Sequence, residues 1–263
     1  MKIAIVTGAS GGIGKTIALS LVASKIHTVF VGRNEKELIK CVSGLDNAEY
    51  ITADMTDAAE SSRVINSVID KHGKVDILVN NLGQNKIFGN IWETDVKDWV
   101  YEFSTNLYSA VYSTSTVLKH MVSRNTGYVI NMAGGGVEDA FKFASSYAAS
   151  KTAITRFTET VGEELAELNS GVKVFALNPG LVDTPHTRSL AVSEKGKKFF
   201  PGLEDLLNAK TGLTTEEGLG EIVKLMISGK IDNLSGRYIE GNKENDYYLN
   251  SDLEDSLVLR IKR

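Results

Sequence analysis

Tyr147 and Lys151 stand four residues apart. On a helix, residues at this spacing lie on the same face, about one turn from each other. A free phenol has a pKa near ~10, and an ammonium group a few ångströms away favours the phenolate and lowers that pKa. Such a pair can pass a proton to or from an alcohol oxygen. The same spacing also arises when a core tyrosine lies beside a solvated lysine. The pair is therefore catalytic only if the rest of the sequence builds a binding site around it.

Length and composition allow one large α/β domain. The 263 residues are 42% hydrophobic and 24% charged, which suffices for a single domain over 1–263 and is small for two. A net charge of -4 argues against nucleic acid or an anionic membrane surface as a partner. The single cysteine, Cys41, cannot form an internal disulfide. No signal peptide and no apolar run of about twenty residues is present, so we expect a soluble, cytoplasmic protein.

Short β-branched segments alternate with longer segments of helical periodicity. Strands are predicted at residues 3–6, 27–31, 49–52, 75–79, 127–131, 172–177 and 237–240. Helices are predicted at residues 13–24, 35–43, 58–72, 96–123, 146–168 and 215–227. This alternation requires crossover connections and predicts a doubly wound, mostly parallel sheet with helices on both faces. Ligands of such sheets bind beyond the carboxyl ends of the strands, so the residues that follow each strand matter most.

A glycine-rich turn joins the first predicted strand to the first predicted helix. The segment reads Thr7-Gly8-Ala9-Ser10-Gly11-Gly12-Ile13-Gly14. Glycines allow positive φ and let a phosphate or ribose approach the backbone, and the following helix points free N–H groups at a pyrophosphate. The alternative is a tight turn without a ligand, but the place between strand and helix is the one that dinucleotide binding requires. The expected contacts are Gly8, Ser10, Gly12, Ile13 and Gly14.

The residues after the second, third and fourth strands suggest where the adenosine half of a cofactor lies. No acid follows the second strand, and Arg33 can instead hold a 2′-phosphate, which favours NADP over NAD. A solvated arginine is the alternative. Asp54 can meet an adenine amino group or cap the next helix. Asn81 belongs to a turn, Asn80 to Gly83, that fits against a nucleoside.

Together these motifs resemble the short-chain dehydrogenase/reductase family. The matching pieces, in the order and at the spacings of that family, are Thr7-Gly8-x3-Gly12-x-Gly14, Asn80-Asn81-Leu82-Gly83, Asn106, Tyr147-x3-Lys151 and Asn178-Pro179-Gly180 with Thr184. The strand and helix pattern follows the family across nearly the whole chain. A small departure is Leu82, where the family usually has alanine.

The resemblance implies a Rossmann-type fold and a nicotinamide-dependent interconversion of an alcohol and a ketone or aldehyde. Tyr147 is then the general acid/base, Lys151 holds the nicotinamide ribose and lowers the pKa of the tyrosine, and Asn106 supports a proton-relay water. The residues implied to line the nicotinamide are Pro179, Gly180, Val182 and Thr184. Relatives commonly pair through the two long helices, so the resemblance also implies a homodimer or homotetramer. The expected partner is a small-molecule carbonyl or alcohol.

One departure from the family pattern bears directly on chemistry. The serine that usually polarises the substrate oxygen stands about thirteen residues before the tyrosine, and here Gly134, with Ala133 before it, carries no hydroxyl. Three interpretations remain open: a reductase that uses substitute donors, a slow enzyme that has lost about 10²–10³ in rate, or a dinucleotide-binding regulatory or scaffold protein. Candidate substitutes are the N–H groups of 134–136; Ser145 and Ser146 are better explained as helix caps.

Residues 183–213 form a long irregular stretch that we expect to be a mobile substrate lid with short helices. Four phenylalanines suggest an apolar pocket wall, or simply lid packing. They are Phe141, Phe143, Phe199 and Phe200. Residues 242–263 form a charged tail whose apolar run at 257–261 can dock on the domain or on another subunit. The histidines are scattered and show no metal-ligand spacing, so no metal is expected.

Overall fold

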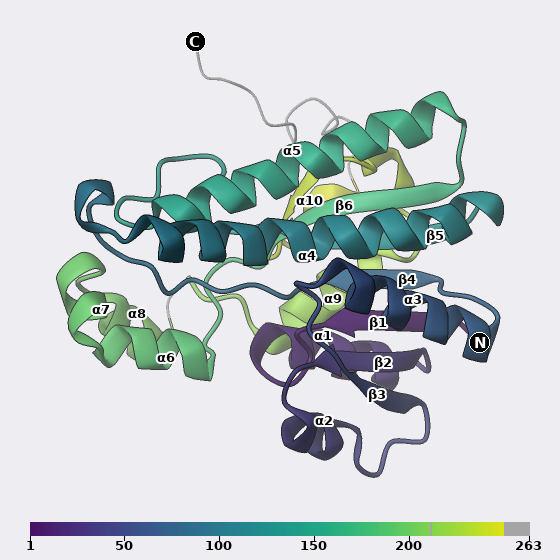
Figure 1. Cartoon of the computed structure of the whole chain (residues 1–263), viewed down its shortest axis with the longest axis horizontal. Coiled ribbons are helices and arrows are strands. Elements are labelled where there is room, and N and C mark those ends of the chain that lie inside the picture. Colours follow the sequence, from purple (N-terminus) through teal and green to yellow (C-terminus); the bar gives the residue numbers. More distant parts are fainter. Residues whose placement is uncertain (211, 250–263) are drawn as a thin grey trace.

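The computed structural model of the protein describes residues 1–210 and 212–249. Seven strands form one sheet in the order β3-β2-β1-β4-β5-β6-β7, and each neighbouring pair is parallel (Figure 1). The strands are β1 (Ile3–Thr7), β2 (His27–Gly32), β3 (Ala48–Thr52), β4 (Ile77–Asn80), β5 (Gly127–Met132), β6 (Val172–Asn178) and β7 (Tyr238–Glu240). Each predicted strand is confirmed, with bounds that differ by at most two residues. The order reverses between β1 and β4, which places the switch point there.

The predicted helices are confirmed to the same accuracy, and short helices are added to them. They are α1 (Gly12–Ala23), α2 (Glu35–Val42), α3 (Ala58–His72), α4 (Val96–Ser123), α5 (Ser145–Glu167), α6 (Pro185–Val192), α7 (Glu194–Phe199), α8 (Leu203–Ala209), α9 (Glu216–Met226) and α10 (Asn245–Tyr248), with 3-10 turns at Ile91–Glu93 and Asp232–Leu234. Within the described residues, no helix is both long enough and apolar enough to span a membrane.

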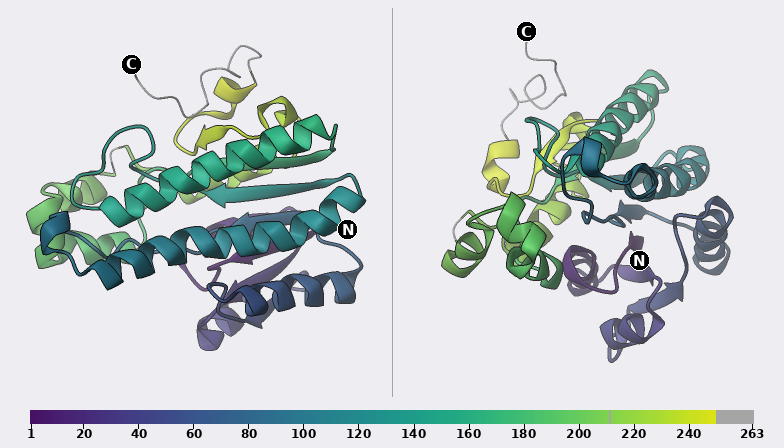
Figure 2. Two further views of the ribbon diagram at one scale, coloured as in Figure 1. Left: turned by 45° about the horizontal axis from the view of Figure 1, so that its top comes forward. Right: turned by 60° about the vertical axis from the view of Figure 1, so that its left-hand side comes forward.

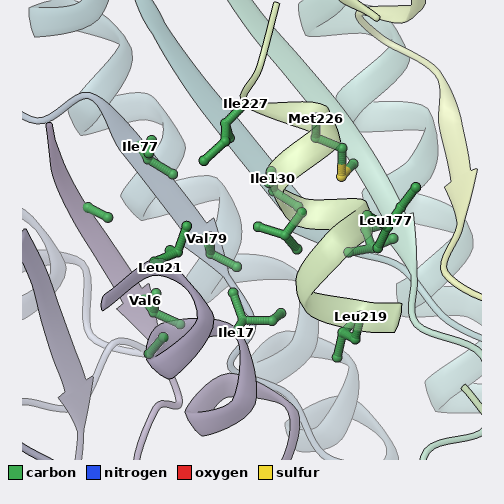
Figure 3. Close-up of a cluster of buried hydrophobic side chains, with 14 of the residues drawn as sticks. Val6, Ile17, Leu21, Ile77, Val79, Ile130, Leu177, Leu219, Met226 and Ile227 are labelled. Carbon is green, nitrogen blue, oxygen red and sulfur yellow. The ribbon is translucent and has the colours of Figure 1, made fainter. Parts of the chain in front are cut away.

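Helices cover both faces of the sheet because successive strand side chains point to opposite sides. On one face, Ile17 and Leu21 of α1 and Leu219 of α9 pack against strand residues such as Val6 and Val79 (Figure 3). The other face carries α3, α4 and α5 side by side (Figure 2), packed through a second buried cluster. The doubly wound parallel sheet predicted from the sequence is therefore the observed fold.

A buried polar network fixes α4 and α5 to the carboxyl ends of two central strands. Asn80, at the end of β4, donates from Nδ2 to Asn131 Oδ1 at 2.8 Å and to Thr114 Oγ1 of α4 at 2.9 Å. Asn131 of β5 in turn donates to Thr158 Oγ1 of α5 at 3.0 Å. Because buried amides are costly unless hydrogen-bonded, these contacts select one arrangement of the two helices over the sheet.

The predicted lid contains three short helices, α6 to α8, which lie beyond the carboxyl ends of the strands (Figure 1). Arg188 of α6 links this helix to α8: its Nε and Nη2 donate to the two carboxylate oxygens of Asp183, at 2.7 and 2.6 Å, and its Nη1 donates to Asn208 of α8 at 2.6 Å. In the tail, the Tyr248 hydroxyl donates to the carbonyl of Glu240 at 3.0 Å. The apolar run at 257–261 lies outside the described residues.

Candidate active site

The glycine-rich turn lies at the switch point, between β1 and α1. Gly8 and Gly12 have φ of +65° and +53°, a conformation that glycine adopts at no steric cost. A Cβ on Gly14 would come within 2.4 Å of both the Gly8 carbonyl and the Asn81 Nδ2. Asn81 Nδ2 donates to the carbonyl oxygens of Thr7 and Gly8 at 3.0 and 3.3 Å, so the β4 loop is locked against the turn. The backbone packing therefore requires the glycine pattern.

The amino terminus of α1 fits an anionic group. No side chain caps it, its first turn holds no acidic residue, and a Cβ built on Gly11 would meet nothing within 4 Å. Free N–H groups and the positive end of the helix dipole thus face open space. Ser10 lies beside the end of β2, with its Oγ 3.4 Å from a Cβ built on Gly32. Thr184 lies 3.8 Å from a Cβ built on Gly12, so the segment after β6 approaches the same turn.

The end of β2 places Arg33 next to Asp54, which follows β3. Arg33 Nη1 lies 3.7 Å from Asp54 Oδ2, and both side chains are largely exposed. Asp54 accepts hydrogen bonds from the backbone N–H and hydroxyl of Thr56. Although burial opposes it, these bonds and Arg33 hold the pKa of Asp54 below its usual value. Asp57, not Asp54, caps α3. Arg33 is therefore an exposed cation at the end of β2, with Asp54 as its neighbour.

Tyr147 and Lys151 meet at the carboxyl end of β5, as expected from their spacing. A Cβ built on Gly134 would lie 2.3 Å from the Tyr147 hydroxyl and 3.4 Å from Lys151 Cγ. Lys151 Nζ donates to the carbonyl of Met132 at 2.8 Å and lies 5.6 Å from the centre of the tyrosine ring. The two side chains are thus held against the strand end by its backbone.

The net shift of the Tyr147 pKa in this arrangement is upward, opposite to the lowering expected from Lys151. Burial raises the pKa of Tyr147 to about 12, and the negative charge of Glu102 adds to the effect. Burial also lowers the pKa of Lys151 to about 8. The reason is geometric, because the lysine nitrogen is bound to a main-chain carbonyl instead of the phenol, so desolvation prevails over charge attraction. At pH 7 the phenol is protonated and most of the lysine is charged.

Asn106 of α4 joins this group through the loop after β4. Its Oδ1 accepts from the N–H of Gln84 at 2.7 Å, and its Nδ2 donates to the carbonyl of Gln84 at 2.9 Å and to Ser150 Oγ at 3.1 Å. A Cβ built on Gly83 would lie 3.2 Å from Asn106 Oδ1 and 3.3 Å from Lys151 Nζ. The amide oxygen and the ammonium therefore border the same backbone position, where a side chain would crowd both of them.

The position that faces Tyr147 is Gly134, whereas Ala133 points the other way. Ala133 is buried in a small cluster with Val137, Ala176 and Tyr238. Of the two positions without a hydroxyl, Gly134 is therefore the one next to the tyrosine. A side chain at Gly134 would occupy the space that the tyrosine hydroxyl now fills. Among the described residues, the N–H groups of 134–136 have no protein acceptor, which leaves them free to serve as donors.

The expectation that Ser145 or Ser146 caps α5 is wrong. The N-cap is Ala144, which provides no side-chain hydrogen bond. Ser145 Oγ instead accepts from Trp99 Nε1 at 2.9 Å, and Ser146 Oγ donates to Glu102 Oε1 at 2.5 Å. Both hydroxyls are thus used to attach the start of α5 to α4, and neither replaces the missing serine.

Glu102 is a site residue that the sequence reasoning missed. It is fully buried on α4, and its Oε2 accepts from the backbone N–H groups of Lys86 and Ile87 at 2.6 and 3.1 Å. With the bond from Ser146, the carboxylate links the loop after β4 to the start of α5. Its position in the sequence could have indicated it, because Glu102 stands four residues before Asn106 and therefore lies on the same face of the helix.

Aromatic rings connect the lid to the tyrosine. Phe141 lies edge-on to Tyr147 with ring centres 6.1 Å apart, and 5.5 Å from Phe200 at the end of α7. Phe200 contacts Phe88, which the sequence reasoning missed, at 5.0 Å, and Phe143 contacts Phe199 at 4.8 Å. The contacts confirm that these rings pack the lid against the segment before α5, and Phe141 also contacts Tyr147; the pocket wall stays a prediction.

The remaining predicted contacts lie where β6 ends. Pro179 follows that strand directly, and Gly180 has φ of +71° and would place a Cβ 2.6 Å from Thr214 Oγ1. Val182 is buried, and Thr184 Oγ1 accepts from Thr187 N–H at 3.1 Å and so caps α6. This segment therefore has a fixed course between the strand and the lid.

Comparison with known proteins agrees with this geometry. Residues 2–195 match the family model described as short chain dehydrogenase. The chain belongs to the short-chain dehydrogenase/reductase family. An uncharacterised oxidoreductase of Staphylococcus epidermidis is 34% identical over 205 residues, which are 78% of this chain and 88% of that protein.

Solved structures of this family have the same fold. A single-residue variant of the actinorhodin polyketide ketoreductase, solved with NADPH, is 28% identical and superposes with a TM-score of 0.80 over 91% of this chain and 95% of its own. A short-chain dehydrogenase/reductase from Saccharomyces cerevisiae is 26% identical, with a TM-score of 0.81 over 95% of this chain and 100% of its own. Membership of this family makes the protein an oxidoreductase. The specific reaction must be inferred from the residues of its own site.

Proposed function

We propose that this short-chain dehydrogenase/reductase, a single domain over 1–263, is an NADP-dependent oxidoreductase that interconverts an alcohol and a ketone or aldehyde. The observation that carries the proposal is the meeting of Tyr147, Lys151 and Asn106 at the ends of β4 and β5, beside an uncapped α1 amino terminus. This meeting supports the proposal because a proton donor is needed close to the turn that would hold the dinucleotide.

The residues present fit the cofactor. The turn from Gly8 to Gly14 takes the pyrophosphate on the N–H groups of α1, Arg33 takes the 2′-phosphate, and the segment from Pro179 to Thr184 borders the nicotinamide. A bound nicotinamide supplies or accepts the hydride at the substrate carbon. NADPH in the ketoreductase structure supports the choice of NADP over NAD.

Tyr147 is proposed to move the proton. With a pKa of about 12 it is a neutral phenol at pH 7 and suits donation to a carbonyl oxygen, which favours reduction. Lys151, with a pKa of about 8, is cationic at pH 7 and stabilises the phenolate left behind. Asn106 fixes the loop through Gln84 and keeps its Oδ1 beside the lysine nitrogen, where a relay water has an acceptor.

The substrate oxygen needs a polarising donor besides the tyrosine. Backbone N–H groups of 134–136 are the proposed substitute for the missing serine, because the described chain supplies no acceptor for them. The ring of Phe141 beside Tyr147, which Phe200 contacts and which Phe88 reaches through Phe200, favours a carbonyl compound with a flat apolar group.

A homodimer or homotetramer remains part of the proposal. Large apolar side chains are exposed at the start of α4 and just before it, which is unusual for a surface without a partner. They are Ile91, Trp92, Val96, Val100 and Tyr101.

The test is NADPH oxidation with a panel of ketones, aldehydes and quinones. Wild type is compared with Tyr147→Phe and with the control Tyr108→Phe, an exposed tyrosine on α4. We expect Tyr147→Phe to lose at least about 100-fold in turnover while NADPH still raises its melting temperature. Unchanged turnover in Tyr147→Phe would refute the mechanism.

A second candidate is a dinucleotide-binding regulatory or scaffold protein, and the specific observation in its favour is the glycine at the serine position. Its signature is a melting temperature that rises with NADPH while no carbonyl compound of the panel is reduced.

A further inference from the structure

Three polar side chains from separate elements meet at the amino-terminal end of the sheet, the end opposite Tyr147. His27 begins β2, Glu49 lies in the adjacent strand β3, and His72 is the last residue of α3. Residues 27, 49 and 72 show no metal-ligand spacing in the sequence, yet their side chains lie close together in the fold. The fold alone brings them together.

The three groups present their ligand atoms to a common point. Glu49 Oε1 lies 2.7 Å from His72 Nε2 and 3.7 Å from His27 Nε2, and the ligand atoms all lie within 4.8 Å of one another. The imidazole rings are tilted by 46° with centres 4.7 Å apart. The side chains are only 14 to 20% exposed, so the cluster is mostly removed from solvent.

The cluster leaves one polar atom unsatisfied. His27 Nε2 is buried and has no hydrogen-bond partner among the described residues, because the 3.7 Å to Glu49 is too long for one. A buried nitrogen without a partner is destabilising. A metal ion bound by His27, Glu49 and His72 together would use the lone pair of His27 Nε2. A cluster held only by hydrogen bonds leaves that lone pair without a partner.

We propose that His27, Glu49 and His72 bind a divalent transition-metal ion of the zinc type, a site separate from the dinucleotide site. Two imidazoles and one carboxylate form a ligand set that suits zinc, whose bonds of about 2.0–2.1 Å place tetrahedral ligand atoms about 3.3 Å apart. The two distances to Glu49 Oε1, 2.7 and 3.7 Å, lie on either side of that value, and all three ligand atoms lie within 4.8 Å of one another, so side-chain rotations that draw the imidazoles together complete the site. The fourth position is left to water.

Lys71 is the neighbour that opposes this ion. Its ammonium pairs with Glu49 Oε2, which leaves Oε1 for the two histidines but adds a positive charge beside the site. Repulsion between the ammonium and the ion lowers the affinity. Removing the lysine charge therefore has the opposite effect from removing a ligand, and this contrast distinguishes a metal site from a hydrogen-bonded cluster.

The experiment titrates chelator-treated full-length protein with zinc chloride in a calorimeter, with magnesium chloride as the hard-ion control. The variants are His27→Gln, His72→Gln and Lys71→Gln, and the matched control is His186→Gln, an exposed histidine of the lid. We expect one zinc per chain, a loss of more than about 100-fold in affinity for the two ligand variants, since even outer partners of a metal contribute about 10- to 100-fold, and tighter binding for Lys71→Gln.

A direct probe keeps the proposal testable if a variant fails to fold. Co²⁺ added to wild type is expected to give the intense visible absorption of a four-coordinate nitrogen and oxygen site, which zinc abolishes. The proposal is overturned if wild type binds zinc no more tightly than folded His27→Gln, if His186→Gln loses the same affinity, or if the cobalt spectrum is that of the free ion.

Discussion

Adding one methyl group at Gly134 should disable the proposed proton donor without touching the cofactor cradle. The Cβ of Gly134→Ala would lie 2.3 Å from the Tyr147 hydroxyl oxygen, about 1 Å inside ordinary contact. The phenol is the end of a side chain and can move, so the protein should fold with the hydroxyl displaced by about that distance. A misplacement of 1 Å at a reacting group costs on the order of 10²-fold in rate.

The control lies one residue further on. A Cβ on Gly135 meets only the ring of Phe141, at 3.6 Å, which is ordinary contact, and neither glycine has a positive φ. Turnover of NADPH with the best carbonyl compound is measured for wild type, Gly134→Ala and Gly135→Ala, together with the dissociation constant of NADPH. We expect only Gly134→Ala to lose about 100-fold in kcat, with NADPH binding unchanged in all three proteins.

Equal turnover in Gly134→Ala and Gly135→Ala would mean that the tyrosine hydroxyl does not act where the structure places it.

A serine at position 134 adds a further comparison. Gly134→Ser introduces the same clash as alanine together with the hydroxyl that relatives use. Higher turnover than Gly134→Ala would show that a hydroxyl there polarises the substrate, whereas Ala133→Ser, whose side chain faces the buried cluster, should leave turnover unchanged.

Three further predictions follow from the same geometry. The folded pKa of Lys151 is lowered to about 8, so its positive charge is present below that pH and lost above it. We therefore expect kcat for reduction to fall as pH rises through about 8, while Tyr147, with a pKa of about 12, stays protonated. A kcat that is constant up to pH about 10 would contradict this. Arg33→Ala should raise the KM for NADPH roughly tenfold, which is the effect of losing one exposed charged hydrogen bond. The KM for NADH should change by less than about twofold. An equal rise in both KM values would mean that Arg33 does not bind the 2′-phosphate. Glu102→Gln should lower the free energy of unfolding in urea by roughly 2–3 kcal/mol, because a neutral amide forms weaker hydrogen bonds with the two loop N–H groups and with Ser146 than the carboxylate does. The exposed control Glu163→Gln should change it by less than about 0.5 kcal/mol.

Most of the fold could be predicted from the sequence because its elements depend on local pattern. Strand residues such as Ile3 and Val79 are followed by turns and periodic apolar helices, so both the elements and their parallel order follow from periodicity and crossover rules. The glycine turn and the pair of Tyr147 and Lys151 could also be predicted from the sequence, because the geometry of each is set within one turn or one helix.

What the sequence by itself determined is therefore the doubly wound sheet, the dinucleotide turn and the identity of the proposed dyad. Only the tertiary structure decided that Gly134 and not Ala133 faces the phenol, that Glu102 lies buried beside it, and that burial sets the pKa of Tyr147. The meeting of His27, Glu49 and His72 was likewise decided there. These features depend on distances between segments far apart in the chain and on exclusion of water, and neither quantity is encoded in the spacing of residues along one segment.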